Sequence, residues 1–408
     1  MRVRNYAALF FYGGNMKKKH VIFLLVAVAL TFGALSSIIT GFILKSSDNG
    51  RIYVDNNEYQ YLMKYFEIGD IADLVKEKYY SEVSEDEITE GALIGSVDVL
   101  SDGYSRFYPK EDYSLLDDAA GYNFIGQGLM LKKTDSGYFE VTKVFADTAG
   151  FDANVLKGDV ITKIDGRDTR YLDLDAALSR LRGKSGTEIK LELISADKSE
   201  PIEISFMRRQ DDLQLIFDDV LDGAIGYISV IEFGANAKSE FINALETLSQ
   251  NGAKKLIIDL RGVPGGYISA ATDAADLFLT SGTIATQYDK TGTVTAWTAT
   301  ESASWSGQTV ILTDSETAGA AEVFAAALKE NSAATIIGTK TAAKGCTLKF
   351  FDLGSTGDGL RLITGGYYTP SGNDLAKDSV LPDTEVSSSG TDAETDAVLQ
   401  AAIEYFNQ

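Results

Sequence analysis

The residues that could do chemistry in this sequence gather around the segment TDSETAGAAEVFAAAL, residues 313–328. A β-rich run, residues 308–314, stops here at polar residues, and an alanine-rich amphipathic stretch follows. Acyl-transfer enzymes place a serine at such a strand-to-helix turn, because free N–H groups of the helix start face the reacting carbonyl. The residue at the apex of this turn, however, is Gly319. The segment therefore indicates the site of an acyl-transfer enzyme without its usual nucleophile.

The composition limits the machinery that could serve this turn. The chain holds one histidine, His20, far in sequence from every candidate site. A Ser-His-Asp arrangement is therefore not expected, and any serine chemistry would use the Ser-Lys variant. One histidine also excludes a histidine-rich metal site, and one cysteine, Cys346, excludes a disulfide framework and a cysteine-based zinc site. We expect no metal and no cofactor.

The charge balance bears on the class of partner. The formal net charge is −22, from 59 acidic and 37 basic residues. Binding to duplex nucleic acid needs a concentrated basic face, so no nucleic-acid partner is expected. The acidity is explained most simply by solubility and self-repulsion.

An uncharged apolar run, residues 21–44, is long enough to span a bilayer as a tilted helix. Lys17, Lys18 and Lys19 precede it, so the positive-inside rule keeps the N-terminus cytoplasmic and exports the remainder. A cleaved signal peptide is the alternative, although the run is long for one. We expect a single-pass protein of the cell membrane, with residues 1–20 cytoplasmic and the bulk of the chain extracytoplasmic.

The elements that position the turn follow from the spacing of apolar residues. Residues 45–118 combine a short linker with helical spacing, and residues 119–210 carry short strands with one helical piece at 173–182. Strands and helices alternate over residues 211–408, as in βαβ units on a mostly parallel sheet, and a closing helix ends the chain. The sequence thus predicts a mixed α/β fold.

Several motifs follow one another between about residue 59 and the C-terminus. They are LSDGYSRFYPKEDY (100–113), FIGQG (124–128), TAGFDANVLKGDVITKIDG (148–166), RGKSGT (182–187), DLRGVPGGY (259–267), KTAAKGCTL (340–348), YYTPSG (367–372) and LPD (381–383). In this order they resemble the C-terminal processing peptidases, or tail-specific proteases, which are Ser-Lys enzymes with an inserted PDZ domain. The resemblance implies a PDZ-like module at 119–210 and a peptidase-like core at 211–408.

The resemblance also implies a peptide-binding site in the PDZ-like module. The implied residues are Phe124, Ile125, Gly126, Gln127 and Gly128 in the carboxylate loop, and Ala177, Leu178 and Leu181 beside the last side chain of the peptide. A PDZ module adds a peptide strand to its sheet edge and holds the carboxylate with backbone N–H groups. Gly126 and Gly128 allow that approach because they lack a Cβ atom. A simple turn is the alternative role for these glycines.

The same resemblance assigns catalytic positions in the core. Lys344 matches the catalytic lysine, which would accept a proton from a hydroxyl if burial beside apolar groups favours its neutral form. A solvated surface lysine is the alternative. Gly265, with Gly266, and Ala320 would supply the backbone N–H groups of an oxyanion hole. A plain strand-to-helix turn is the alternative there.

The pattern breaks at two catalytic positions. The family serine stands three residues before a glutamate, here Glu322, and about 25 before the lysine, and both counts end at Gly319. The orienting glutamine, expected four residues after the lysine, is Leu348. Gly319 has no side chain with which to attack a carbonyl, and the side chain of Leu348 cannot form a hydrogen bond. Electrostatics at the helix start would account for Glu322.

A displaced nucleophile would have to come from Ser315, Thr317 or Cys346. Cys346 would lie on the same side of an extended chain as Lys344, and a nearby amine would lower the thiol pKa. An active serine-type or cysteine-type endopeptidase is therefore the alternative hypothesis.

We expect a protein of the tail-specific protease fold that has lost its peptidase chemistry. It would bind C-terminal tails of peptides or proteins through the PDZ-like module, as a homodimer or paired with an active peptidase. A third hypothesis is a structural envelope protein whose module binds no tail.

Overall fold

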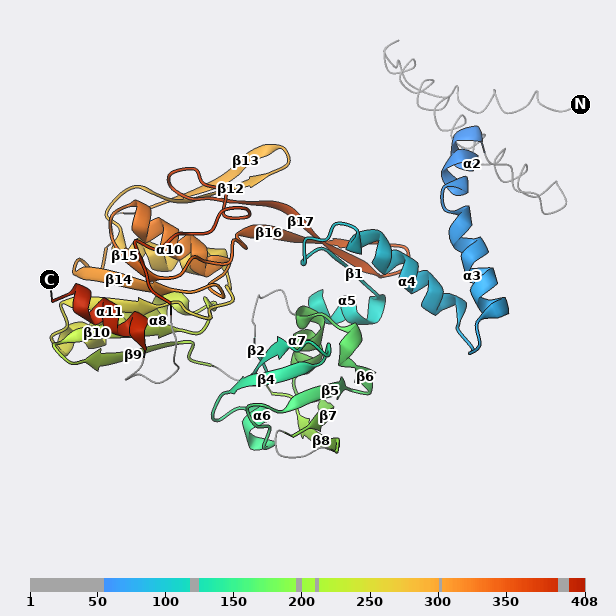
Figure 1. Ribbon diagram of the computed structural model, residues 1–408, viewed down its shortest axis with the longest axis horizontal. Helices are drawn as coiled ribbons and strands as arrows, with labels where there is room; N and C mark the ends of the chain where they lie inside the picture. The colour runs from blue at the N-terminus through green and yellow to red at the C-terminus, as the bar shows by residue number, and fades with distance from the viewer. Residues whose placement is uncertain are drawn as a thin grey trace, which may run out of the picture. The chain divides into compact units, whose positions relative to one another are not determined.

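The structure is a computed structural model that describes residues 55–117, 125–195, 200–209, 213–300, 303–387 and 396–407 (Figure 1). The chain divides after Thr89 into two compact units. The apolar run 21–44 and Phe124 lie outside the described residues. Within the described ranges, every helix is too short or too polar to cross a bilayer.

The first unit holds α2 (Asn56–Met63), α3 (Phe66–Lys78) and the start of α4 (Glu85–Asp98). A capping box begins α2: Asp55 accepts hydrogen bonds from the backbone of Asn57 and Glu58, and the Glu58 side chain accepts one from the Asp55 N–H. The helical spacing predicted for this region is confirmed.

Residues 125–207 form a module built on one seven-stranded antiparallel sheet. Its strands are β2 (Ile125–Gly126), β3 (Leu129–Lys133), β4 (Phe139–Val144), β5 (Val160–Ile164), β6 (Arg167–Asp168), β7 (Glu188–Ile194) and β8 (Ile202–Met207), with helices α6 (Ala149–Asp152), η1 (Thr169–Tyr171) and α7 (Leu174–Arg182). Alternating apolar residues such as Ile189 and Leu191 pack against α7. Asp173 caps α7 by accepting the Ala176 N–H at 2.8 Å. The predicted short strands with one principal helix are confirmed.

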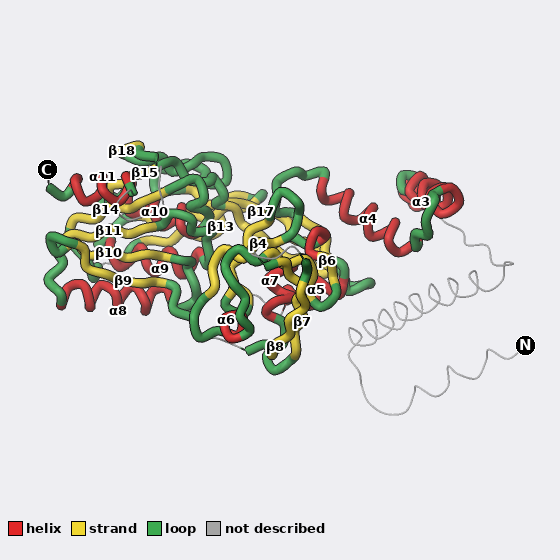
Figure 2. Tube along the Cα trace, turned by 60° about the horizontal axis from the view of Figure 1, so that its bottom comes forward, coloured by secondary structure: helices red, strands yellow, loops and turns green. Residues whose placement is uncertain are grey.

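The core is a second sheet in the order β18-β15-β14-β11-β10-β9, parallel except at β9. Its strands are β9 (Ile216–Leu221), β10 (Ile225–Val230), β11 (Lys255–Asp259), β14 (Gln308–Thr313), β15 (Thr335–Gly338) and β18 (Thr384–Glu385), and most of them lie side by side in Figure 2. Adjacent residues of β11 face opposite cores, because Ile258 packs in one cluster and Ile257 in the other. The continuous apolar run of β11 is typical of a strand buried on both faces.

Helices cover both faces of this sheet. α8 (Ala237–Gln250), α9 (Ile268–Ala275), η2 (Asp276–Phe278) and α10 (Ala320–Glu330) share the larger apolar cluster, and α11 (Ala397–Tyr405) closes the other face with Val398 and Phe406. The predicted alternation of strands and helices is confirmed.

A third sheet was not predicted from the sequence. It pairs β1 (Arg106–Tyr108), β17 (Gly359–Tyr368), β12 (Thr283–Asp289) and β13 (Gly292–Thr298) in that order, with β16 (Cys346–Asp352) also on β17. The short helix α5 (Lys110–Asp117) follows β1. The pairing of Arg106 with Arg361 joins segments far apart in the chain. This sheet positions β16 and therefore the residues that follow Lys344.

A charged network ties the end of β11 to α11. Arg261 donates from Nη1 to Oδ1 of Asp396 at 2.8 Å and from Nε to Oδ1 of Asp259 at 2.9 Å. Asp396 also caps α11 by accepting two backbone N–H groups. Burial acts to raise the pKa of Asp396, but the hydrogen bonds from Arg261 and the helix start outweigh it and hold the pKa below its ordinary value.

Replacing Asp396→Asn should keep the cap and remove the charge, lowering the free energy of unfolding at pH 7 by about 2 kcal/mol. Because the folded-state pKa is lowered, this stabilisation is present above the unfolded-state pKa of about 4 and is lost as pH falls below it. Urea unfolding at several pH values would measure the difference, with the exposed-turn variant Asp222→Asn as control. A deficit that does not shrink in acid would contradict the role of the charge.

Candidate active site

Three loops meet at the carboxyl ends of β11, β14 and β15, where open α/β sheets bind ligands. The Ala318 N–H donates to the Val263 carbonyl at 2.9 Å, and the Ala342 N–H donates to the Thr317 carbonyl at 3.0 Å. These bonds join the loop after β11 to the turn before α10, and that turn to the loop that carries Lys344.

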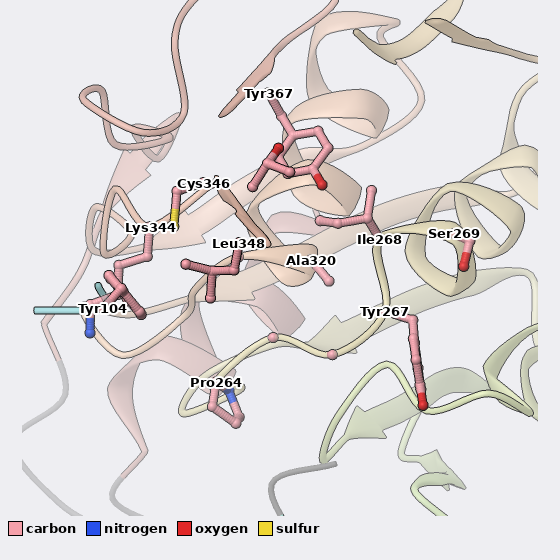
Figure 3. Close-up of a pocket in the computed structure, with 14 residues that line it drawn as sticks. Tyr104, Pro264, Tyr267, Ile268, Ser269, Ala320, Lys344, Cys346, Leu348 and Tyr367 are labelled. Atoms are coloured by element: carbon pink, nitrogen blue, oxygen red, sulfur yellow. The ribbon is translucent and has the colours of Figure 1, made fainter. Parts of the chain in front are cut away.

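A cavity of about 280 Å³ opens between these loops and β16. The structure places in its lining all six catalytic-type positions singled out from the sequence: Gly265, Gly266, Gly319, Ala320, Lys344 and Leu348. In Figure 3, Lys344 and Leu348 lie on one side of Ala320, and Ile268 and Ser269 lie on the other. Residues far apart in sequence thus form one site.

Gly319 stands at the N-cap of α10 with φ 56° and ψ −113°. A Cβ atom built on Gly319 would lie 3.7 Å from the Gly265 Cα and 3.9 Å from the Lys344 carbonyl oxygen, which are ordinary contact distances. Space for a side chain is therefore present, and only the left-handed backbone opposes one, by about 1–3 kcal/mol.

Glu322 holds the start of α10 against the lysine loop. Its carboxylate is fully buried and accepts hydrogen bonds from the Gly319 N–H at 2.9 Å, the Ala343 N–H at 2.8 Å, the Lys344 N–H at 2.7 Å and Thr341 Oγ1 at 2.6 Å. Burial raises the pKa of Glu322, and these bonds oppose the rise. Sequence reasoning assigned Glu322 only a helix-start role and missed this clamp, because its donors come from a loop about 20 residues away.

The loop after β11 presents backbone donors to the cavity. Gly265 and Gly266 have φ of 133° and 118°, and a Cβ atom on Gly266 would come within 2.4 Å of the Phe233 carbonyl oxygen. Only glycine fits there. Over the part of the chain that the structure describes, the N–H groups of Gly265, Gly266 and Ala320 donate to no protein acceptor. They are available to a ligand in the cavity.

Lys344 lines the cavity, but its side chain is exposed. The expectation of a lysine buried beside apolar groups is therefore wrong. The exposed lysine of the alternative is the one that the structure shows, and Glu322 holds its backbone N–H. Lys344 also lines a second cavity of about 520 Å³, together with Tyr104 and Cys346.

Cys346 and Leu348 line the first cavity from alternate positions of β16. Burial raises the pKa of Cys346 to about 11, and the attraction of Lys344 only partly offsets it. The expected lowering of the thiol pKa is wrong, because desolvation outweighs the nearby charge.

The two candidate hydroxyls lie outside the cavity lining. Thr317 is fully buried, and its Oγ1 donates to the Leu260 carbonyl at 2.8 Å and accepts the Asp314 N–H at 3.0 Å. Ser315 is exposed on the turn. The Thr317 hydroxyl thus holds the turn in shape.

The carboxylate loop of the module is held from several sides. A Cβ atom on Gly126 would lie 2.7 Å from Leu181 Cβ, and one on Gly128 would lie 1.9 Å from Thr148 Oγ1. Gln127 Nε2 donates to the Arg182 carbonyl at 3.2 Å, which fixes the loop to the end of α7.

The helix residues expected to contact a peptide belong to the module core. Ala177, Leu178 and Leu181 are fully buried in one apolar cluster, and Gly126 packs closely on Leu181. Their expected contact with the last side chain of a peptide stays a prediction. Of the other expected residues, Ile125 begins β2.

Sequence reasoning also missed cavity residues contributed by distant segments. Tyr104, Ile268 and Tyr367 line the cavity (Figure 3). Burial raises the pKa of Tyr104 above its ordinary value. Tyr104 and Tyr367 stand in motifs quoted above, but nothing in those motifs indicated that they face this cavity.

Comparisons with known proteins agree with this geometry. Residues 224–386 match peptidase family S41, and residues 26–112 match the N-terminal domain of the activating protease CtpB. The solved structure of a photosystem II D1 C-terminal processing protease shares the fold, with a TM-score of 0.55 and 22% identity over 84% of this chain and 96% of that one.

Two relatives cover most of the sequence. A carboxyl-terminal-processing protease of Synechocystis sp. is 33% identical over 76% of this chain and 74% of its own. The carboxy-terminal processing protease CtpA of Bacillus subtilis is 29% identical over 90% of this chain and 77% of its own. The chain belongs to peptidase family S41, among the carboxyl-terminal-processing proteases.

Proposed function

We propose that this chain is a membrane-anchored, extracytoplasmic member of family S41 that binds C-terminal tails without cleaving them. The observation that carries the proposal is Gly319, which stands where the Ser-Lys chemistry requires a hydroxyl. Leu348, at the position that would orient the lysine, supports it. In this proposal the protein holds tails, as a homodimer or beside an active relative.

The described geometry disfavours a displaced nucleophile. Thr317 would have to give up two hydrogen bonds that shape the turn, and Ser315 does not line the cavity. Cys346 does line it, but its raised pKa leaves almost no thiolate at neutral pH. The active endopeptidase is therefore the second candidate, with Cys346 its best-placed nucleophile.

Tail recognition is assigned to the module at residues 125–207. The names of the relatives describe processing at protein C-termini. The Gly126–Gly128 stretch lies tightly against α7 and Thr148, which leaves the loop backbone as the group that could face a carboxylate.

The first prediction from this proposal concerns the membrane anchor. The full chain should stay in the membrane pellet after carbonate extraction, because residues 21–44 carry no charge, and deletion of that run should release it. External protease should degrade the bulk of the chain in intact cells that lack an outer barrier. Recovery of a shortened soluble protein would favour a cleaved signal peptide instead.

The second prediction concerns the vacant nucleophile position, Gly319. Gly319→Ser with Leu348→Gln should cleave a tailed substrate about 100-fold or more faster than the unaltered chain, since base-assisted attack contributes about 10²–10⁴-fold. The left-handed backbone should make this variant less stable by about 1–3 kcal/mol. Substrate turnover and thermal unfolding measure the two effects.

Adding Lys344→Ala to that variant is the matched control and should abolish the regained cleavage. Cleavage by the unaltered chain that disappears with Ser315→Ala, Thr317→Val or Cys346→Ala would instead support the active endopeptidase. A folded Gly319→Ser, Leu348→Gln variant with no activity would show that the loops around Lys344 no longer hold the catalytic groups in position for cleavage.

The third prediction concerns tail binding by the module at residues 125–207. Gly126→Ala should weaken binding of a fluorescent tail peptide about tenfold, or about 1.4 kcal/mol, because the added carbon meets Leu181 Cβ. Gly166→Ala is the control, since it lies in the same module with nothing within 4 Å of the added carbon. Fluorescence anisotropy measures both. Absence of saturable binding by the unaltered protein would favour the structural envelope protein.

A further inference from the structure

The lining of the cavity at Gly319 carries a basic side chain within a strongly acidic chain. The formal net charge of the chain is −22. Among the described residues that line the cavity, however, Lys344 is the only charged one. The carboxylate of Glu322 already accepts four hydrogen bonds from the loops behind the cavity. The carboxylate of Asp102, which lines the adjoining cavity with Lys344, accepts hydrogen bonds from the Tyr104 and Ser105 N–H groups and from the Ser105 hydroxyl. Lys344 is thus the charge that the lining itself offers to a negative ligand.

The cavity also offers hydrogen-bond donors from two separate elements. The N–H groups of Gly265 and Gly266 come from the loop after β11, and that of Ala320 comes from the first turn of α10. A Cβ atom on Gly265 would lie 3.6 Å from the Ala320 nitrogen, so the two donor groups are neighbours. Such donors bind a carbonyl oxygen or one oxygen of a carboxylate.

The missing side chain distinguishes between these two ligands. An intact peptide bond presents one oxygen to the donors, whereas a carboxylate carries a second, charged oxygen. The space beside the Gly319 Cα, with its nearest neighbour 3.7 Å from a built Cβ, is where a serine side chain would otherwise lie. That space can hold the second oxygen, and Lys344 can pair with its charge.

We propose that the cavity at Gly319 binds the free α-carboxylate of a peptide that ends in an apolar residue. The N–H groups of Gly265 and Ala320 hold one oxygen, the other occupies the space at Gly319 near Lys344, and the last side chain packs on Leu348 and Ile268. Such a group is carried by the native C-terminus of a protein and by the new C-terminus that endoproteolysis creates.

This inference rests on the proposed absence of cleavage, because a serine at position 319 would fill the space. It adds a second binding site to the one assigned to the module. The single cysteine, Cys346, lines both this cavity and the second one and serves as the reporter of occupancy. Gly319 lines only the first of the two, so the effect of Gly319→Ala assigns the protection to that cavity.

The test follows alkylation of Cys346 by N-ethylmaleimide at pH 8 in the full-length protein, read by intact mass. A peptide ending in leucine with a free carboxylate should slow the reaction to saturation, and the same peptide with a C-terminal amide should need about tenfold more for half protection. Lys344→Met and Gly319→Ala should each raise the half-protecting concentration of the free acid about tenfold. Equal protection by acid and amide, or no protection by either, would overturn the proposal.

Matched variants separate this site from other effects. Lys340→Met removes a charge from the same loop without touching the cavity, and Gly262→Ala adds a methyl at φ 69° with nothing within 4 Å. Both should leave the half-protecting concentration unchanged, as should Gly126→Ala in the module. If Gly126→Ala instead removes protection, the cleft is not an independent site, while tail binding by the module stands.

Discussion

The buried carboxylate of Glu322 is the interaction on which the cavity depends. A carboxylate without solvent is tolerated only when its oxygens are hydrogen-bonded, and here four donors satisfy them. One donor belongs to the start of α10 and three belong to the loop that ends at Lys344. A single side chain thereby fixes two loops that approach from different strands.

None of these bonds uses a side chain at position 319. The same holds for the bonds from Ala318 to Val263 and from Ala342 to Thr317, which join backbone groups. Loss of a hydroxyl at the apex therefore leaves the scaffold unchanged. This separation between the groups that shape the cavity and the groups that react explains how a chain without the serine can keep the form of the peptidase site.

Much of the fold could be predicted because apolar spacing reports burial directly. The continuous apolar run at β11 is typical of a strand buried on both faces, and the alternation in β7 is typical of a strand buried on one. The sheet of β1, β12, β13, β16 and β17 was missed, since the pairings of β17 with β1 and with β12 join segments far apart in the chain and leave no local signal. Apolar spacing shows which face of α7 is covered but not by what, so it does not reveal that Leu178 packs in the core of the module.

The left-handed backbone at Gly319 has an evolutionary consequence. Any other residue at this apex is held in an unfavourable conformation, and the enzyme keeps it there only while selection for turnover persists. In the proposed loss of cleavage, glycine relieves this strain once that selection has ended. A reversion then has to restore both an unfavourable conformer at position 319 and a hydrogen-bonding side chain at position 348. Such a loss is easier to make than to reverse.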